Sequence, residues 1–232
     1  MKQYLPILFY SLIWIFLYSS LIQGSNSTEQ TDPPSQYKGR TIAPVMSASG
    51  ANWLKRESRE SIELPEQLLD ALDIKSGMTI ADVGAGIGYF SWRLSKRVGP
   101  KGLVYATDIQ KKMIALLNYE LKKRKINNVQ TILGTASDPN LPRASVDIAL
   151  LVDVYHEFKY PETMVSKIRQ ALRNDGKLVL VEYRGEDPNV PIKLEHKMTV
   201  QQVLKEILPM GFQLKTKLDF LPWQHLFIFV KN

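Results

Sequence analysis

The sequence predicts an α/β fold: a doubly wound, mostly parallel sheet of seven strands that ends in an antiparallel C-terminal hairpin. From residue 61 onward, short apolar runs rich in β-branched residues alternate with amphipathic helical stretches, which is the pattern of strand–helix units. The runs are apolar at nearly every position, as in strands that are covered on both faces. Near the C-terminus two such runs are separated by only four residues, which favours an antiparallel hairpin.

The elements follow in a regular order along the chain. A helix over 65–72 leads through a Lys-Ser-Gly turn into the first apolar run. Expected strands cover residues 79–83, 103–107, 129–133, 147–152 and 177–182, and expected helices cover 89–97, 110–125, 161–172 and 200–208. The hairpin strands are expected over 212–220 and 225–231. In such a sheet, ligands bind beyond the carboxyl ends of the strands.

The first 24 residues do not fit this alternation. Lys2 is the only charged residue before Glu29, and residues 5–22 are almost entirely apolar or aromatic. This predicts a signal peptide or an uncleaved membrane anchor over residues 1–24, and the sequence leaves both open. The rest of the chain is then expected to be exported (periplasmic or secreted) or membrane-anchored through the N-terminus. A polar linker is expected over residues 25–50, and the folded domain over residues 51–232.

Composition excludes several kinds of chemistry. The chain has no Cys, which excludes disulfides, thiolate metal sites and cysteine nucleophiles. The three histidines, His156, His196 and His225, are scattered along the sequence, so no metal site is predicted. The net charge of +7 favours anionic partners without identifying one. The basic run at 122–125 lacks interleaved aromatic residues and is expected to be solvated at a helix end, so nucleic acid is not expected as a partner.

The turn after the first strand carries the strongest motif. Asp82 is followed by glycines at 84, 86 and 88, in the pattern D-x-G-x-G-x-G. Glycine lets the backbone bend sharply and approach a ligand, and the helix that follows presents free N–H groups. A nicotinamide-dinucleotide site would need G-x-G-x-x-G, and Tyr89 occupies the position of the third glycine.

A second acid, Asp108, follows the next strand, 20 residues after Gly88. In this kind of fold an acid at that place accepts hydrogen bonds from the two hydroxyls of a ribose. The alternative is that Asp108 caps the helix that begins near Gln110.

With these motifs, the stretch from residue 75 to 182 resembles the class I S-adenosylmethionine-dependent methyltransferases, in the style of the small-molecule ubiquinone/menaquinone-type branch. The resemblance implies a Rossmann-like fold with S-adenosylmethionine as cofactor. It implies that Asp82 contacts the methionine amino group, that the glycine turn lies under the methionine part and the ribose, and that Asp108 binds the ribose. The full set of expected cofactor-binding residues is Asp82, Gly84, Ala85, Gly86, Gly88, Asp108, Ile109, Thr135, Ala136 and Asp153.

The chain departs from the family after the third strand. Where the family commonly has an acid that reaches the adenine amine, this chain has Thr135. Either Asp138 reaches in from further along, or backbone groups near Ala136 read the adenine.

The end of the fourth strand is expected to face the methyl acceptor. It is followed by Asp153, Tyr155, His156 and Glu157, and the expected catalytic residues are His156, Glu157 and Tyr155. His156 titrates near neutrality and is expected to take a proton from the acceptor, with Glu157 or Asp153 orienting it. The alternative is a structural histidine that is hydrogen-bonded within the loop.

Two flanking segments are expected to border the same pocket. Residues 185–197 form a loop of the kind that lies over an acceptor, and the segment from Trp53 to Arg59 is expected to be a lid, or else a surface helix. The predicted function is methyl transfer from S-adenosylmethionine to a small-molecule acceptor. The alternative is a non-catalytic binding protein that retains the fold, and cofactor binding without transfer would distinguish it.

Overall fold

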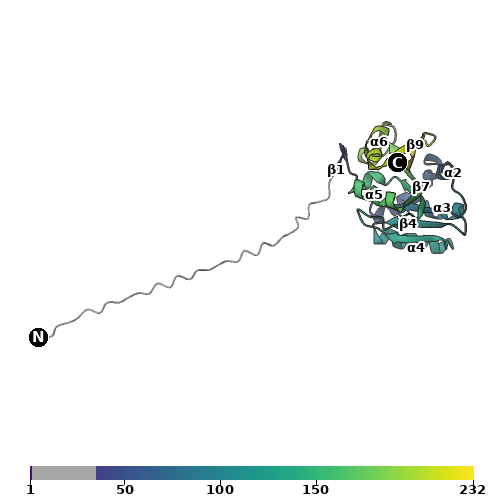
Figure 1. The fold of residues 1–232 in the computed structure, drawn as a ribbon, viewed down its shortest axis with the longest axis horizontal. Helices are drawn as coiled ribbons and strands as arrows, with labels where there is room; N and C mark the ends of the chain where they lie inside the picture. The colour runs from purple at the N-terminus through teal and green to yellow at the C-terminus, as the bar shows by residue number, and fades with distance from the viewer. Residues whose placement is uncertain (2–34) are drawn as a thin grey trace. The chain divides into compact units, whose positions relative to one another are not determined.

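The structure is a computed structural model that describes Met1 and residues 35–232 (Figure 1). The predictions made for the N-terminal apolar segment, residues 5–22, lie outside the described residues. Within the described part of the chain, no helix has the length and apolar character needed to cross a membrane. The described residues 35–232 belong to one compact unit.

The core of this unit is a mixed sheet whose seven main strands run in the order β5-β4-β3-β6-β7-β10-β9. The strands β3 to β7 are parallel, and β10 is antiparallel to both of its neighbours. Their bounds are β3 Thr79–Val83, β4 Leu103–Asp108, β5 Val129–Leu133, β6 Val146–Val152, β7 Leu172–Arg184, β9 Phe212–Leu218 and β10 Gln224–Lys231. A short strand, β8 (Lys197–Met198), pairs with the end of β7. The predicted mostly parallel sheet with a C-terminal hairpin is confirmed.

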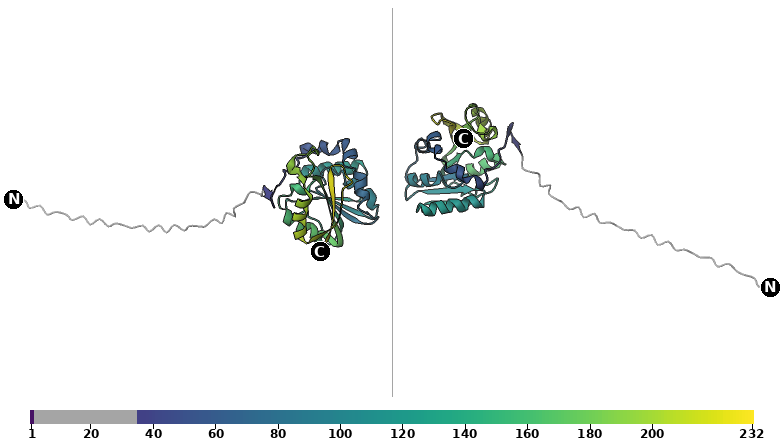
Figure 2. Two further views of the ribbon diagram at one scale, coloured as in Figure 1. Left: turned by 90° about the horizontal axis from the view of Figure 1, so that it is seen from above. Right: turned by 180° about the vertical axis from the view of Figure 1, so that it is seen from behind.

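Helices cover both faces of the sheet (Figure 2). The α-helices are α1 Ser58–Ile62, α2 Pro65–Asp70, α3 Ser91–Val98, α4 Lys111–Lys123, α5 Pro161–Ala171 and α6 Val200–Ile207, and the 3₁₀ helices are η1 Ala48–Lys55, η2 Tyr155–Glu157, η3 Leu194–His196 and η4 Leu208–Met210. Successive residues of β3 point to opposite faces: Ile80 packs in the cluster that contains α2 and α3, and Ala81 in the cluster that contains α5 and α6. Because both clusters are apolar, the strands are apolar at consecutive positions.

The chain order reverses between β3 and β6. From β3 the chain proceeds outward through β4 to β5, then returns to the other side of β3 as β6 and proceeds through β7. The loops after β3 and β6 therefore leave the sheet in opposite directions, which opens a crevice beyond their carboxyl ends.

The folded unit begins before residue 51. A small hairpin, β1 (Gln36–Tyr37) and β2 (Arg40–Thr41), is hydrogen-bonded to α6: Arg40 Nε donates to Glu206 Oε1 at 2.7 Å, and Gln202 Nε2 donates to the Lys38 carbonyl at 3.2 Å. The Ala43 N–H donates to the His156 carbonyl at 3.0 Å. The predicted linker over residues 25–50 is thus wrong over residues 35–50. Hydrogen bonds to distant residues attach this polar segment to the domain. Its composition therefore does not indicate that it belongs to the fold.

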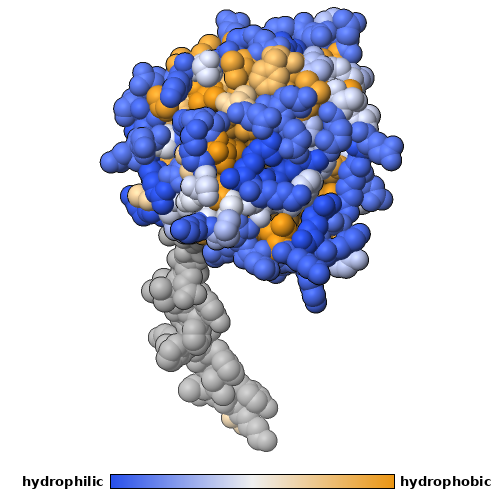
Figure 3. Space-filling model, turned by 90° about the vertical axis from the view of Figure 1, so that its right-hand side faces the viewer, coloured by the Kyte–Doolittle hydropathy of each residue, from blue (hydrophilic) through white to orange (hydrophobic). Residues whose placement is uncertain are grey.

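Hydrophilic residues dominate the molecular face drawn in Figure 3, and hydrophobic residues occupy separate smaller areas. Two of the most exposed large hydrophobic residues are Leu194 in η3, at 77 % exposure, and Tyr119 in α4, at 64 %. Single exposed apolar residues are usual in folded proteins.

Candidate active site

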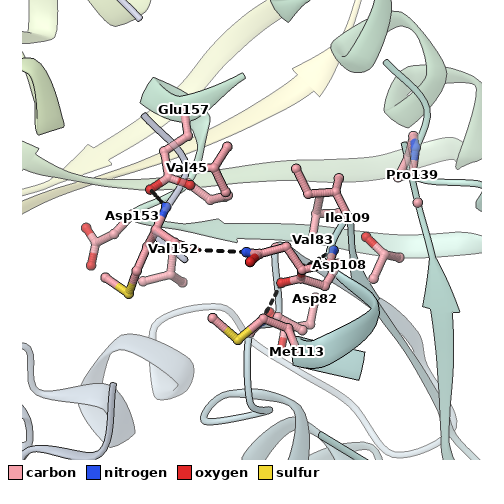
Figure 4. A pocket seen from close by; sticks show the side chains of 18 of the residues that line it. Val45, Asp82, Val83, Asp108, Ile109, Met113, Pro139, Val152, Asp153 and Glu157 are labelled. Carbon is pink, nitrogen blue, oxygen red and sulfur yellow. Dashed lines mark hydrogen bonds between the residues drawn. The ribbon is translucent and has the colours of Figure 1, made fainter. Parts of the chain in front are cut away.

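One pocket lies at the crevice beyond the carboxyl ends of β3, β4, β5 and β6. In the view of Figure 4, Asp82 and Asp108 lie in the middle, with Pro139 on one side and Asp153 and Glu157 on the other. The pocket is lined by nine of the ten residues expected to bind the cofactor: Asp82, Gly84, Ala85, Gly86, Asp108, Ile109, Thr135, Ala136 and Asp153. Gly88 alone of that set lies elsewhere.

The carboxylate of Asp108 is buried at the end of β4 and braces the glycine turn. Its Oδ2 accepts from the Gly86 N–H at 3.1 Å, and its Oδ1 accepts from the Gln110 N–H at 2.8 Å. The capping alternative is therefore partly realised, since Gln110 precedes the first residue of α4. Each carboxylate oxygen has two acceptor positions, so one on each oxygen remains for the two hydroxyls of a ribose. Burial raises the pKa of Asp108 above its ordinary value.

Asp82 lies on the neighbouring strand β3, opposite Ala106 of β4, and is also buried. Its Oδ2 accepts from the Ser91 hydroxyl at 2.6 Å. Burial raises the pKa of Asp82 to about 6, while the nearby Arg59 opposes the rise. A carboxyl with this pKa is ionised near neutral pH and suits an ammonium group, as the resemblance implies.

The three glycines of the motif have two different roles: two line the pocket, and one allows close packing between helices. Gly84 and Gly86 line the pocket, whereas Gly88 does not. A Cβ placed on Gly88 would lie 2.2 Å from Leu117 Cδ1 of α4, and the φ of Gly88 is +83°. Gly88 therefore allows the start of α3 to approach α4, and its predicted cofactor contact is not supported by this geometry.

The loop after β5 contributes Thr135 and Ala136 to the pocket, and Asp138 is not among the lining residues. The Thr135 hydroxyl accepts from the Asp138 N–H at 3.0 Å, and Asp138 forms an ion pair with Lys167 at 3.1 Å. Asp138 is thus directed away, which favours backbone groups near Ala136 for reading an adenine.

Only two of the four residues in the predicted catalytic cluster line the pocket. Glu157 and Asp153 line the pocket, but Tyr155 and His156 do not. Tyr155 is fully buried and its hydroxyl donates to Glu206 Oε2 at 2.7 Å. The chain forms the 3₁₀ turn η2 here, so consecutive side chains point in different directions. Direct contact of Tyr155 or His156 with a substrate in this pocket is not supported.

Asp153 directly follows β6 and has an uncommon backbone conformation. Its φ is +52°, a left-handed value that costs energy in a non-glycine residue and is found at functional sites. Gln224 Nε2 donates to both carboxylate oxygens, at 2.9 and 2.8 Å. Burial, together with the negative Glu63 and Glu182, raises the pKa of Asp153 well above its ordinary value.

Glu157 is the second acid at this end of the pocket. Burial raises the pKa of Glu157 to about 7. Its Oε1 accepts from the Met46 N–H at 3.2 Å, which joins this side of the pocket to the N-terminal part of the domain.

Residues 45–54, here called the covering segment, border the pocket, and the lid expected over residues 53–59 shares only Trp53 and Leu54 with this segment. Val45, Met46, Trp53 and Leu54 are lining residues. Gln110 fastens the segment: its Nε2 donates to the Met46 carbonyl at 2.8 Å, and its Oε1 accepts from the Ala48 N–H at 3.1 Å. No sequence pattern points to Gln110 or Met46, because neither residue belongs to a motif or carries a charge.

Arg59 is the buried cation beside the pocket. Its side chain is 6 % exposed, and its Nε donates to Glu63 Oε2 at 2.5 Å. Arg59 lines the pocket next to the glycine turn. A guanidinium at this place suits a carboxylate, so the chain offers Arg59, Asp82 and Asp108 for the three polar parts of an amino-acid nucleoside. The donor set therefore fits S-adenosylmethionine.

Comparison with known proteins agrees with this geometry. Residues 81–180 match the family model described as "Methyltransferase domain", a range that runs from within β3 to within β7 and includes the loops after β3, β4, β5 and β6. The structure is similar to the crystal structure of a SAM-dependent methyltransferase from Aquifex aeolicus, with a TM-score of 0.76 and 24 % identity, over 80 % of this chain and 98 % of that one. At 24 % identity, this similarity establishes a shared fold and nothing more specific.

Two relatives are similar in sequence. The chain is 28 % identical over 139 residues to nocamycin O-methyltransferase of Saccharothrix syringae, which covers 60 % of this chain and 47 % of the relative. It is 25 % identical over 134 residues to demethylmenaquinone methyltransferase of Lactococcus lactis subsp. lactis, which covers 58 % and 51 %. The chain thus spans about half the length of these curated relatives. Residues 81–180 thus match the methyltransferase-domain family, and the fold and the pocket of the chain resemble those of the class I S-adenosylmethionine-dependent methyltransferases.

Proposed function

We propose that the protein transfers the methyl group of S-adenosylmethionine to a small-molecule acceptor. The observation that carries the proposal is the buried carboxylate of Asp108, which braces the glycine turn and keeps an acceptor position free on each oxygen. The pocket extends from this carboxylate to Asp153 and Glu157, so a cofactor held at one end leaves the other end for the acceptor.

The cofactor supplies, when bound, a methyl group on a sulfonium; the acceptor's nucleophile forms a bond to that carbon while the carbon–sulfur electron pair remains on sulfur. The protein's part is to align the acceptor and to exclude water. The covering segment supplies the enclosure, through Leu54 over the glycine turn and Met46 beside Glu157. Where the nucleophile carries a proton, a pocket carboxylate receives it, and Asp153 and Glu157 are the groups placed to do so.

The acceptor is proposed to be a small molecule rather than a macromolecule. Two of the relatives bear the names of small-molecule methyltransferases. The covering segment also encloses the pocket, which suits an acceptor that enters whole.

The test is methyl transfer from S-adenosylmethionine carrying a labelled methyl group to a panel of phenols, quinols, carboxylic acids and amines. We expect label in one class of acceptor with the wild-type protein, and much less with Asp108→Ala. Asp138→Asn serves as the matched control, because this acid neighbours the pocket without lining it. Label that appears equally with Asp108→Ala would contradict the proposal.

A second candidate is a binding protein that retains the fold without turnover. The observation that favours it is Thr135, which stands where the family commonly has an acid and whose hydroxyl is engaged with the Asp138 N–H. Tight cofactor binding with no transfer to any acceptor would support this candidate.

We also propose that the N-terminus directs the chain to export or to a membrane. The support is the sequence alone, an apolar stretch over residues 5–22 behind Lys2. An exported enzyme would need its cofactor, which is made in the cytosol, to be supplied outside. Cell fractionation with N-terminal sequencing of the mature protein tests this: cytosolic protein with an intact, unanchored N-terminus would contradict it.

A further inference from the structure

Two histidines that are forty residues apart in sequence meet beside the pocket. His156 belongs to η2 and His196 to η3, and His156 Nε2 lies 3.1 Å from His196 Nδ1. A carboxylate oxygen of Glu157 completes a group of three ligand atoms that all lie within 4.8 Å of one another. Two imidazole nitrogens at this separation are as far apart as two neighbouring ligands of one tetrahedral metal ion, for which the metal–nitrogen distance is about 2.0–2.1 Å.

The other face of His156 is fixed by a buried carboxylate. His156 Nδ1 lies 2.5 Å from Glu182 Oε2, and Glu182 is fully buried on β7. Glu182 Oε1 also accepts from the Tyr155 N–H at 3.0 Å, so the carboxylate is held in place. A carboxylate on Nδ1 keeps the proton on that nitrogen and directs the lone pair of Nε2 toward His196, as in the carboxylate–histidine–metal arrangement.

The charges around the pair also suit a divalent cation. Glu182 Oε2 lies 2.5 Å from His156 Nδ1, and a carboxylate oxygen of Glu157 lies within 4.8 Å of a ring nitrogen of His156, so two carboxylates border this ring. Arg40, the nearby guanidinium, is engaged with Glu206 through both Nε and Nη2, at 2.7 and 3.1 Å. Two carboxylates beside two neutral imidazoles carry a charge that one divalent ion would neutralise.

We propose that His156 Nε2, His196 Nδ1 and Glu157 form a binding site for a divalent transition-metal ion of the zinc class. Two imidazoles and one carboxylate are a known ligand set for zinc sites that keep a fourth position open. Calcium and magnesium are disfavoured, because they prefer sites made of oxygen ligands.

The position of the site suggests its use, and this part rests on the proposed function. Glu157 belongs both to the metal cluster and to the lining of the pocket, at the end away from Pro139. The fourth position is inferred to take an oxygen of the methyl acceptor, which a cation would make easier to deprotonate. With the ion bound, Glu157 is a ligand and Asp153 remains as the free pocket carboxyl.

The test is a titration of the full-length chain with zinc after removal of metals by a chelator. Isothermal titration calorimetry is expected to show one ion bound per chain. Cobalt(II) in place of zinc is expected to give the strong visible absorption of a four-coordinate ion with nitrogen and oxygen ligands. His196→Ala is the main variant, because His196 lies in a short, partly exposed turn and its loss leaves the sheet intact.

Two further variants sharpen the result. Glu182→Gln removes the charge behind His156 and is expected to weaken zinc binding about 10- to 100-fold. His225→Gln is the matched control: His225 is held by Glu186 at 2.9 Å and Asp219 at 3.1 Å, outside the cluster. It is expected to bind zinc as the wild type does.

Absence of zinc binding by the wild type, or binding that His196→Ala leaves unchanged, would overturn the inference and would leave a plain hydrogen bond between two histidines. Metal-free protein is expected to bind S-adenosylmethionine, because Asp82 and Asp108 are not among the metal ligands. If the wild-type protein binds S-adenosylmethionine but not zinc, the metal site alone is rejected. If the wild-type protein does not bind S-adenosylmethionine, the proposed function is rejected.

Discussion

Asp108 both stabilises the glycine turn and lines the cofactor pocket. Its carboxylate accepts hydrogen bonds from two backbone N–H groups and faces the pocket. We expect Asp108→Ala to weaken S-adenosylmethionine binding by about 1.5–3 kcal/mol, the range for a hydrogen bond to a charged group. Calorimetric titration measures the dissociation constant, and circular dichroism verifies the fold.

Asp138→Asn is the control for this change, since Asp138 pairs with Lys167 outside the pocket. Its dissociation constant is expected to equal that of the wild type. An Asp108→Ala protein that binds the cofactor with unchanged affinity would refute the assignment of Asp108 to the ribose.

The raised pKa of Asp82 leads us to expect that cofactor binding depends on pH. Because burial raises the pKa of Asp82 to about 6, the cofactor-free protein holds this carboxyl protonated below that pH. An ammonium group binds the ionised form, so affinity is expected to rise as the pH increases toward about 6 and to level off above it. Asp82→Asn cannot ionise and is expected to lack this rise.

The measurement is the dissociation constant of both proteins between about pH 5 and pH 7, the window around the raised pKa of Asp82. Both proteins retain Asp108, so their difference reports on Asp82. Parallel curves for the two would show that Asp82 does not meet the amino group.

The sequence predicted the positions of the cofactor-binding acids correctly, but not the orientations of the residues expected to be catalytic. Asp82 and Asp108 lie in or at the end of strands that the pattern located correctly, so their place at the pocket followed from topology. The orientations of Tyr155 and His156 did not follow, because a single 3₁₀ turn decides them. The meeting of His156 with His196 depends on two loops far apart in sequence, which no local pattern reveals.

Among the elements, the contact between α3 and α4 depends on Gly88. Gly88→Ala adds a methyl group 2.2 Å from the buried Leu117 side chain, at a φ of +83°. Gly77→Ala has the same kind of φ, +89°, with no atom within 4 Å of the added carbon. We expect Gly88→Ala to lose about 1–3 kcal/mol more unfolding free energy than Gly77→Ala, the usual cost of overpacking. Urea denaturation measures both; equal losses would mean that backbone strain alone explains Gly88.

The N-terminal hairpin is attached to α6 through a buried ion pair. Glu206 is fully buried, and Arg40 is its cationic partner. Arg40→Met leaves this carboxylate uncompensated, so we expect a loss of about 3–5 kcal/mol in unfolding free energy. Lys38→Met, on the same hairpin, removes an exposed pair with Glu162 at 3.7 Å and is expected to change stability by less than about 0.5 kcal/mol.

Denaturant unfolding of the two variants compares these losses. A small effect of Arg40→Met would show that residues 35–50 are not part of the cooperative unit. The double variant Arg40→Met/Glu206→Gln is expected to recover part of the loss, because no buried charge then remains.

The elements that the sequence predicted well are those with apolar periodicity. The predicted strand over 79–83 and helix over 161–172 agree with β3 and α5 within one residue, since each packs an apolar stripe into the core. The elements it missed, β1, β2 and η1, are short and polar and depend on hydrogen bonds to partners such as α6 and Gln110. Local sequence does not encode such partners.

Across the whole domain, the sheet order explains why residues from four strands meet. The reversal between β3 and β6 brings the ends of β3, β4, β5 and β6 to one crevice, and residues 45–54 close over it. The fold could be predicted because strand–helix alternation limits the topology to few choices. The enclosure of the pocket could be predicted only in part: the expected lid included Trp53 and Leu54, whereas Val45 and Met46 lie in residues expected to form a linker.

Binding of S-adenosylmethionine in this crevice is tested directly by a calorimetric titration of the full-length protein with that compound and, separately, with NADH. We predict saturable binding of one S-adenosylmethionine per chain and no binding of NADH, because Tyr89 breaks the dinucleotide motif. No heat of binding with millimolar S-adenosylmethionine, or preferential binding of NADH, would show that the crevice is not an S-adenosylmethionine site.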